Sequence, residues 1–469
     1  MKKIILCGII ILALFFIVSC KDDTEQEKNT ENNSNPKDNN EIIMEDWYFF
    51  RCYNGMPIFD THSSSFQYVS PVKINPISKN VTYVCLDALC DHYNYSTDCP
   101  FTRSANYLIT GNYIFYQKGA ISRFQNTGEL ISDLSLCVYD MTNGAVRQLA
   151  EYKDQFKVIG GADGYCYYFI EQYDHDPIYS SEETSSMKYI LYRADAKTGK
   201  IIEMPLYVNY SYEQKNGIAL VYPTIHAIID KKIYWYCHDE NKNMIYYTTD
   251  LEGENRVIID FGEHSEYIFS YFGRYYDGYF YYTTFNDFDN LIGYEYERAF
   301  YDKKLYRIAV DGIKESELIS ESVITYVLCG DKIYYTKADE KAEFIDTKDY
   351  YGLYPESIYN WSGGKIYVMN SDGTDKKLLC ETGYNLSLGN GGIFQYGYVD
   401  AKTINGIDYV VWSYTGIRKQ EGDFMDSYSY AASPDTVIIN ASTGAFTVVS
   451  MPDALPGVDG EFIILSMPE

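Results

Sequence analysis

Residues 245–258 read IYYTTDLEGENRVI: a run of aromatic and β-branched residues, a turn at Gly253, and a second apolar run. Aromatic and β-branched residues suit a pleated strand, and glycine supplies the positive φ angle that a tight turn between two strands needs. The same pattern returns in residues 366–379, which read IYVMNSDGTDKKLL. An aromatic strand signal occurs seven times, at residues 46–50, 112–116, 164–168, 232–236, 278–282, 332–335 and 406–410. Repetition at a spacing of a few tens of residues predicts a propeller or a solenoid.

Each repeat holds four strand signals, which we name A to D from the axis outward. In the sixth repeat they fall at residues 323–328, 333–337, 365–370 and 376–380. The A–B turns carry Asp or Gly, and the C–D turns of six repeats carry a glycine, at Gly144, Gly199, Gly253, Gly312, Gly373 and Gly444. Such residues favour tight hairpins. The sequence therefore predicts an all-β fold, a seven-bladed β-propeller of four-stranded antiparallel blades.

The two ends of the repeat region predict how the ring closes. The first repeat starts with its B strand at Trp47 and has no A strand before it. After the last D strand, at residues 445–450, the chain continues with an apolar run at residues 461–466. We expect this C-terminal strand to supply the missing innermost strand of the first blade, because closure removes free sheet edges.

The repeat resembles two related propeller groups, the TolB-type repeat and the YWTD propellers of the LDL-receptor class with their bacterial lipoprotein relatives. Residues 245–258 and 366–379 carry the resemblance, which extends over most of the chain after the N-terminal segment. The chain keeps the tyrosine of the YWTD tetrapeptide and mostly replaces its tryptophan. In those families the tetrapeptide is a packing element, so the resemblance implies a fold and no particular activity.

The N-terminus predicts a lipid-anchored, extracytoplasmic protein. Lys2 and Lys3 precede an apolar run over residues 4–18, and Ser19 and Cys20 follow it. This arrangement resembles the signal peptide and lipobox of bacterial lipoproteins, which implies a signal peptide over residues 1–19 and a lipid on Cys20. The alternatives are an ordinary secretory signal or a transmembrane anchor, but the apolar run is short for a span. The lipid would tie the protein to the outer face of the plasma membrane, or to the outer membrane of a double-membraned cell.

The segment after the lipid site predicts a tether. Residues 20–44 are rich in Asn, Glu, Asp and Lys, and such a composition cannot bury enough apolar surface to fold. Residues 45–469 then form one propeller domain. The formal net charge of -27 argues against nucleic acid as a partner, because no basic stripe could displace phosphate counterions. It also favours a soluble monomer.

Long connections predict which face of the propeller binds a ligand. A–B and C–D turns share one face, and the longest insertions fall between B and C strands, at residues 117–135, 170–188, 284–302, 338–364 and 414–434. Long loops on a rigid scaffold often carry function. The ligand-binding candidates are the aromatic residues of these loops: Tyr173, Tyr179, Tyr294, Tyr296, Tyr350, Tyr351, Tyr354, Tyr359, Trp361, Tyr428 and Tyr430. Interleaved with carboxylates, they suit an extracellular glycan, a peptide or a protein. The alternative is that they only pack the loops down.

A cysteine cluster is the densest chemical signal in the predicted propeller. Cys85, Cys90, His92 and Cys99 fall between the first D strand and the second A strand, and we expect them on the loop-rich face. They could form a Cys3His zinc site, although their spacing matches no standard zinc motif. In an exported protein the alternative is a disulfide, joining Cys90 to Cys99, or Cys85 to Cys52 or Cys137, and redox chemistry is a third alternative.

Motifs for catalysis are absent from the sequence. There is no Gly-x-Ser-x-Gly elbow, no His-Glu-x-x-His pair and no glycine-rich phosphate loop. Acidic residues at 287–290 could hold calcium, but their spacing is unspecific. We therefore nominate no catalytic residue and no cofactor, and expect a binding module rather than an enzyme. The alternative function is a carbohydrate-active hydrolase or lyase whose carboxylates come from different blades.

Overall fold

The structure is a computed structural model, and its described residues all belong to the unit Ile43–Glu469. The other unit, Met1–Ile42, holds the expected signal peptide, Cys20 and most of the expected tether, which therefore lie outside the described residues. The structure describes residues 48–51, 71–87, 89–90, 99–101, 104–119, 121–123, 130–132, 134–153, 155–173, 187–206, 223–238, 243–262, 274–284, 304–337, 343–348, 355–360, 365–382, 387–389, 399–420, 427–450 and 463–464.

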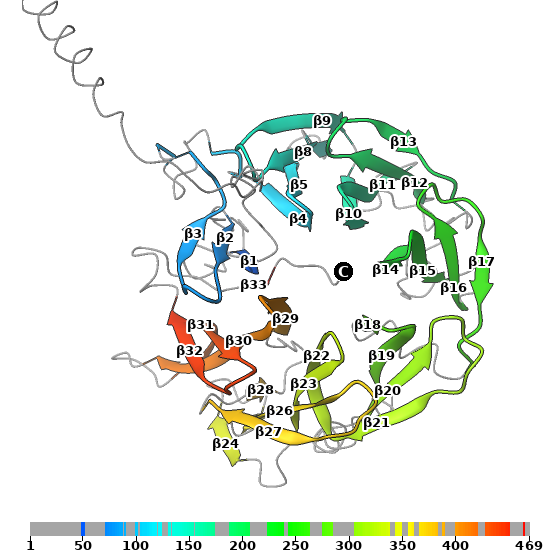
Figure 1. Cartoon of the computed structure of the whole chain (residues 1–469). Helices are drawn as coiled ribbons and strands as arrows, with labels where there is room; N and C mark the ends of the chain where they lie inside the picture. Colours follow the sequence, from blue (N-terminus) through cyan, green and yellow to red (C-terminus); the bar gives the residue numbers. More distant parts are fainter. Residues whose placement is uncertain are drawn as a thin grey trace, which may run out of the picture. The chain divides into compact units, whose positions relative to one another are not determined.

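Seven four-stranded antiparallel sheets form the blades, in the order A to D from the innermost strand to the outermost (Figure 1). Blades 1 to 4 consist of β33 (Ile463–Ile464), β1 (Tyr48–Arg51), β2 (Val72–Ile74) and β3 (Val81–Tyr83); β4 (Ser104–Thr110), β5 (Tyr113–Lys118), β8 (Leu134–Asp140) and β9 (Val146–Tyr152); β10 (Gln155–Ala162), β11 (Tyr165–Tyr173), β12 (Met187–Asp195) and β13 (Ile201–Glu203); and β14 (Thr224–Ile229), β15 (Lys232–His238), β16 (Met244–Asp250) and β17 (Val257–Ile259). Blades 5 to 7 consist of β18 (Arg274–Tyr276), β19 (Tyr279–Thr284), β20 (Lys304–Ala309) and β21 (Glu317–Glu321); β22 (Val323–Cys329), β23 (Lys332–Lys337), β26 (Lys365–Asn370) and β27 (Lys377–Glu381); and β29 (Val399–Ile404), β30 (Ile407–Gln420), β31 (Ser427–Asn440) and β32 (Phe446–Ser450). This confirms the predicted seven-bladed propeller.

The hairpin turns are as tight as the sequence predicts. The C–D turn glycines adopt positive φ angles, for example 80° at Gly253 and 83° at Gly373. Asp250, the last residue of β16, orders its turn because its Oδ1 accepts the backbone N–H groups of Glu252 and Glu254 at 3.1 and 2.8 Å. Aspartate commonly caps a turn in this way. The glycine and aspartate positions therefore fix where one strand of a blade ends and the next begins.

Buried side chains join the blades into a ring. Seven clusters of buried residues occur, and each combines two neighbouring blades, including blade 7 with blade 1. Val72 of β2, for example, shares a cluster with Val411 of β30. The B strands carry most of the largest fully buried side chains, such as Tyr167, Tyr281 and Trp412. The repeated aromatic residues are therefore packing residues between blades, and they hold the scaffold rather than a ligand.

The C-terminal strand closes the ring as predicted. Strand β33 pairs antiparallel with β1, with Ile464 opposite Phe50 and Ile463 opposite Arg51. It thereby occupies the innermost position of blade 1, next to the axis (Figure 1). Residues from the two ends of the domain consequently share one sheet.

Candidate functional site

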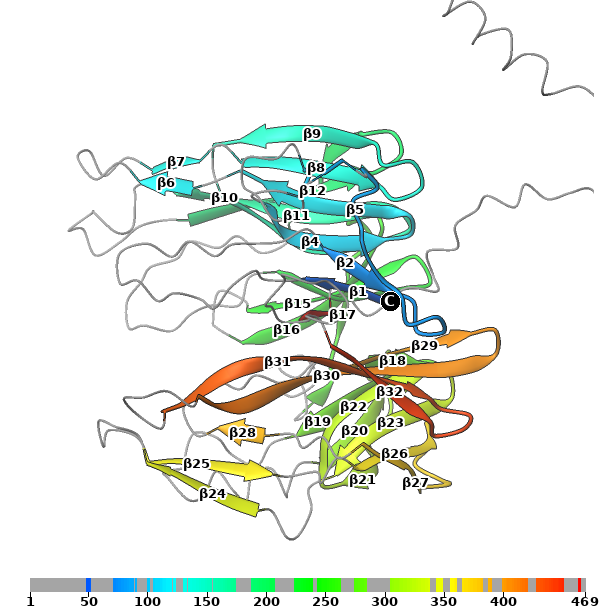
Figure 2. The same cartoon turned by 90° about the vertical axis from the view of Figure 1, so that its left-hand side faces the viewer.

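Additional β-structure extends from one face of the propeller. Between β5 and β8 lie β6 (Ile121–Arg123) and β7 (Leu130–Ser132), and between β23 and β26 lie β24 (Glu343–Lys348) and β25 (Pro355–Asn360). Strand β28 (Ser387–Gly389), from the connection between blades 6 and 7, pairs with β25. Figure 2 shows these strands and the far end of the β30–β31 hairpin on the side opposite the short turns. Three B–C connections therefore carry paired strands on the predicted face, and in a fourth the pairing of β11 with β12 continues to Tyr173 and Met187.

The structure places the backbone of four of the predicted ligand-binding residues on these extensions. Tyr173 ends β11 opposite Met187, and Tyr359 lies in β25 opposite Phe344. Tyr428 and Tyr430 occupy alternate positions of β31, opposite Lys419 and Ile417. The remaining candidates lie outside the described residues: Tyr179, Tyr294, Tyr296, Tyr350, Tyr351, Tyr354 and Trp361. The acidic segment 287–290 also lies outside them.

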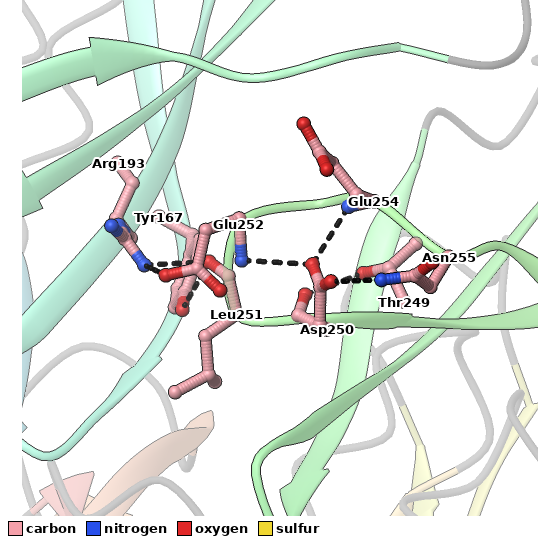
Figure 3. Close-up of polar contacts among 8 residues, drawn as sticks. All are labelled: Tyr167, Arg193, Thr249, Asp250, Leu251, Glu252, Glu254 and Asn255. Atoms are coloured by element: carbon pink, nitrogen blue, oxygen red, sulfur yellow. Dashed lines mark hydrogen bonds and ion pairs between the residues drawn. The ribbon is translucent and has the colours of Figure 1, made fainter.

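The opposite, short-turn face is tied together by contacts between blades (Figure 3). Arg193 of β12 donates a 2.8 Å hydrogen bond to the Leu251 carbonyl oxygen in the C–D turn of blade 4, and it forms a 2.9 Å ion pair with Glu252. The Tyr167 hydroxyl of β11 donates to the same carbonyl at 3.2 Å. Burial raises the pKa of Tyr167, so its hydroxyl stays a donor. Two side chains of blade 3 thus hold one turn of blade 4.

The same arrangement recurs at other seams. In blade 5 the Tyr281 hydroxyl and the Arg307 guanidinium both donate to the Ser371 carbonyl oxygen in the turn of blade 6, at 3.1 and 3.5 Å. In blade 2, Arg147 donates to the carbonyl oxygens of Ala196 and Lys197 in the turn of blade 3. On the short-turn face, these arginine and tyrosine side chains therefore bind the turns of neighbouring blades.

Three cysteines of the predicted cluster converge. The sulfur atoms of Cys85, Cys90 and Cys99 all lie within 4.8 Å of one another. Cys85 and Cys99 are buried in the cluster of side chains between blades 1 and 2, and Cys90 is half-buried. His92, the fourth predicted member, lies outside the described residues.

The position of the cluster differs from the predicted one. Leu86, which follows Cys85, donates its backbone N–H to the Tyr139 hydroxyl of blade 2 at 2.9 Å and packs beside Gly144 in the C–D turn of that blade. The D strand of blade 1 is only three residues long, so the chain leaves the sheet early and enters the seam. The cysteines therefore lie at the seam between blades 1 and 2, and Leu86 beside them reaches the short-turn face rather than the expected loop-rich face.

The surroundings of the sulfur atoms favour protonated thiols when no metal is bound. A hydrogen bond with Cys99, together with burial, raises the pKa of Cys85. Burial, with a smaller effect from Cys99, raises the pKa of Cys90 to about 12. One contact acts in the opposite direction, because the backbone N–H of Asp87 donates to the Cys85 sulfur and so favours its thiolate.

The suggested disulfide partners of Cys85 differ in position. Cys137 belongs to the same buried cluster as Cys85, and it makes a hydrogen bond with the Tyr116 hydroxyl. Cys52 lies outside the described residues. The three-sulfur group contains both Cys90 and Cys99 as free thiols, so its geometry is compatible with the predicted disulfide as well as with a metal site.

Sequence reasoning missed Arg274 and Tyr326, two polar residues on the inner strands of blades 5 and 6. The Tyr326 hydroxyl of β22 donates to the Tyr281 carbonyl oxygen at 2.6 Å and accepts the backbone N–H of Arg274 from β18. The Arg274 guanidinium donates to the Val399 carbonyl oxygen of β29 at 3.2 Å. The ring centre of His226 in β14 lies 4.7 Å from that of Phe280, and burial lowers the pKa of this histidine to about 3. Nothing in the local sequence marks Arg274, because its partners lie in other blades.

No protein-family model matches the chain, and no curated protein matches it significantly. Among solved structures, TolB from Acinetobacter baumannii aligns with 70% of this chain and 62% of its own, at 10% identity and a TM-score of 0.31. The oligogalacturonate lyase of Vibrio parahaemolyticus aligns with 79% of this chain and 88% of its own, at 12% identity and a TM-score of 0.39. The β-propeller domain of the Trilobed protease from Pyrococcus furiosus aligns with 78% of this chain and 98% of its own, at 12% identity and a TM-score of 0.34. The chain spans 26% of the tricorn protease. No activity follows from similarities this low.

Within the described ranges, no helix is both long and apolar enough to cross a bilayer.

Proposed function

We propose that the protein is a lipid-anchored, extracytoplasmic binding module that captures a glycan, a peptide or a protein through the B–C face of its propeller. The observation that carries the proposal is the asymmetry between the two faces. Two B–C connections carry extra paired strands and two more carry extended B–C hairpins, whereas the turns of the other face are short and hold neighbouring blades together. A face with long extensions on a rigid ring is where ligands usually bind.

The residues on these extensions support a ligand contact. Tyr428 and Tyr430 lie at alternate positions of β31, in the part of the hairpin beyond the blade. Tyrosine gives a large contact area at a low cost in conformational entropy, and its ring can stack on a sugar or an aliphatic side chain. The acidic composition of the chain adds carboxylate acceptors for hydroxyl or ammonium donors.

Binding can be tested with glycan and peptide arrays probed by the full-length protein in detergent. The double variant Tyr428→Ala, Tyr430→Ala should lose at least about tenfold in affinity, since aromatic contacts at binding sites are commonly worth about 2 kcal/mol or more. Ile313→Ser is the matched control, because Ile313 is 83% exposed in the C–D turn of blade 5. Unchanged binding by the tyrosine variant, or no binding by the unmodified protein to either array, would contradict the proposal. Release of reducing or unsaturated sugar ends would instead indicate a glycoside hydrolase or lyase.

The anchor needs its own test. The lipid on Cys20 is proposed from the sequence, in which Cys20 follows the apolar run directly after Ser19. Cells fed a labelled fatty acid should transfer the label to the protein and not to Cys20→Ala. Cys7→Ala is the control, because Cys7 lies inside the apolar run and should leave labelling intact. Equal labelling of the Cys20→Ala variant would rule out this anchor.

A further inference from the structure

We propose that Cys85, Cys90 and Cys99 together bind one zinc ion at the seam between blades 1 and 2. The proposal does not depend on the ligand of the B–C face. It rests on the convergence of three sulfur atoms, all within 4.8 Å of one another. A Zn–S bond of about 2.3 Å places the sulfurs of a tetrahedral site about 3.8 Å apart, which fits within that limit.

The number of sulfur atoms favours a metal over a disulfide. A disulfide needs two cysteines, and it leaves no reason for a third sulfur to lie near both of them. Here the third sulfur is that of Cys90, which lies in the short turn that begins at Asp87, just after Cys85. Cys90 donates its backbone N–H to the Asp87 carbonyl oxygen at 3.2 Å, and Leu89 donates to the Asp87 Oδ1 at 2.9 Å. The turn therefore brings Cys90 back toward Cys85 along the chain.

A contact around the sulfur atoms also suits a metal thiolate. The Asp87 backbone N–H points to the Cys85 sulfur, and such an N–H···S hydrogen bond stabilises negative charge on a ligand. Cys85 and Cys99 are only 6% and 3% exposed, so the site is shielded, while Cys90 is half-buried and gives a metal ion a route from solvent. Three thiolates select zinc over magnesium or calcium, which prefer oxygen ligands.

The proposed site would stabilise the seam. Cys85 follows β3 of blade 1, and Cys99 precedes β4 of blade 2, so one ion would join the segments that leave one blade and enter the next. Binding converts three thiols to thiolates and releases their protons to solvent. Because binding releases these protons, zinc affinity should fall as the pH falls.

The test measures zinc in the full-length protein, purified with its thiols reduced and then equilibrated with zinc alone. Elemental analysis should give about one zinc per chain, as expected for a single thiolate site. Cobalt should replace the zinc and produce a thiolate-to-cobalt charge-transfer band. Chelation of the zinc should lower Tm.

Single cysteine variants then locate the site. Cys90→Ser should lose most of the zinc and remain folded, because Cys90 is half-buried and serine adds no volume. Cys380→Ser is the matched control, since Cys380 is also half-buried and lies in β27 of blade 6. It should keep its zinc. No zinc in the reduced unmodified protein, or equal zinc in both variants, would overturn the proposal. So would a peptide map showing a disulfide between two of the three cysteines in protein isolated without reductant.

Discussion

Arg193 in blade 3 donates a 2.8 Å hydrogen bond to the carbonyl oxygen of Leu251 in blade 4. Its guanidinium also lies 4.6 Å from the ring centre of Tyr165 and pairs with Glu252. The contact with the Leu251 carbonyl oxygen is partly buried, whereas the contact with the Glu252 carboxylate is exposed. Arg193 is 14% exposed and Glu252 is 58% exposed, so the two interactions should differ in strength.

Arg193→Ala should therefore lower the free energy of unfolding by about 1–3 kcal/mol, the usual effect of removing a charged hydrogen bond to a shielded partner. Glu252→Ala should lower it by less than about 1 kcal/mol, because an exposed ion pair contributes little. Urea unfolding of both variants measures the difference. Equal losses would mean that the ion pair, not the carbonyl contact, stabilises the seam.

Removal of the closing strand should disrupt the ring. A chain that ends after residue 458 lacks β33, which pairs with β1 at Phe50 and Arg51. We expect its Tm to fall by at least about 10 °C and its transition to broaden, since several kcal/mol of pairing and packing are lost. A chain that ends after residue 466 keeps β33 and should melt like the full protein. Identical melting of the shorter chain would show that closure by β33 is dispensable.

Two turn glycines with similar backbone angles should respond differently to a methyl group. Gly312 and Gly278 have φ angles of 69° and 79°, so alanine is strained at both by about 1–2 kcal/mol. At Gly312 the added Cβ would also overlap the Asp260 carbonyl oxygen of blade 4, whereas at Gly278 no atom lies within 4 Å. Gly312→Ala should therefore cost about 1–3 kcal/mol more than Gly278→Ala. Thermal unfolding of the pair checks this, and equal costs would place the two blades farther apart at this turn.

His226 should make stability depend on pH. Burial, with a smaller effect from Arg274, lowers the pKa of His226 from 6.5 to about 3, and its Nε2 atom is shielded from solvent. The unfolded state therefore binds a proton below about pH 6.5 that the folded state does not. Stability should be full above that pH and fall by up to about 1.4 kcal/mol for each unit as the pH falls toward 3.

The variant His226→Phe isolates this effect, because it cannot titrate and retains a ring beside Phe280. Urea unfolding at about pH 7 and about pH 5 should give a smaller loss of stability for the variant than for the unmodified protein. Carboxylates titrate in both proteins, so their contribution cancels in the comparison. The same pH dependence in both would show that His226 gains its proton in the folded state.

Much of the fold could be predicted from local sequence because each determinant is local. Alternating aromatic residues define the strands, and a glycine such as Gly253 defines a turn through its own φ angle of 80°. The apolar run that contains Ile463 and Ile464 had no other place in a ring with one missing strand, so closure was predictable too. The conformation of the insertions could not be predicted, because it depends on contacts with neighbouring blades.

The sequence by itself determined the seven repeats, the tight turns and the faces to which turns and long connections belong. The tertiary structure decided which distant groups meet. Arg274 and Val399 are 125 residues apart in the chain, and their hydrogen bond exists because blades 5 and 7 both present inner strands to the axis. Cys85 and Cys99 meet because a short D strand releases the chain into a seam. Strand formation depends on neighbours along the chain, whereas these contacts depend on how whole blades pack.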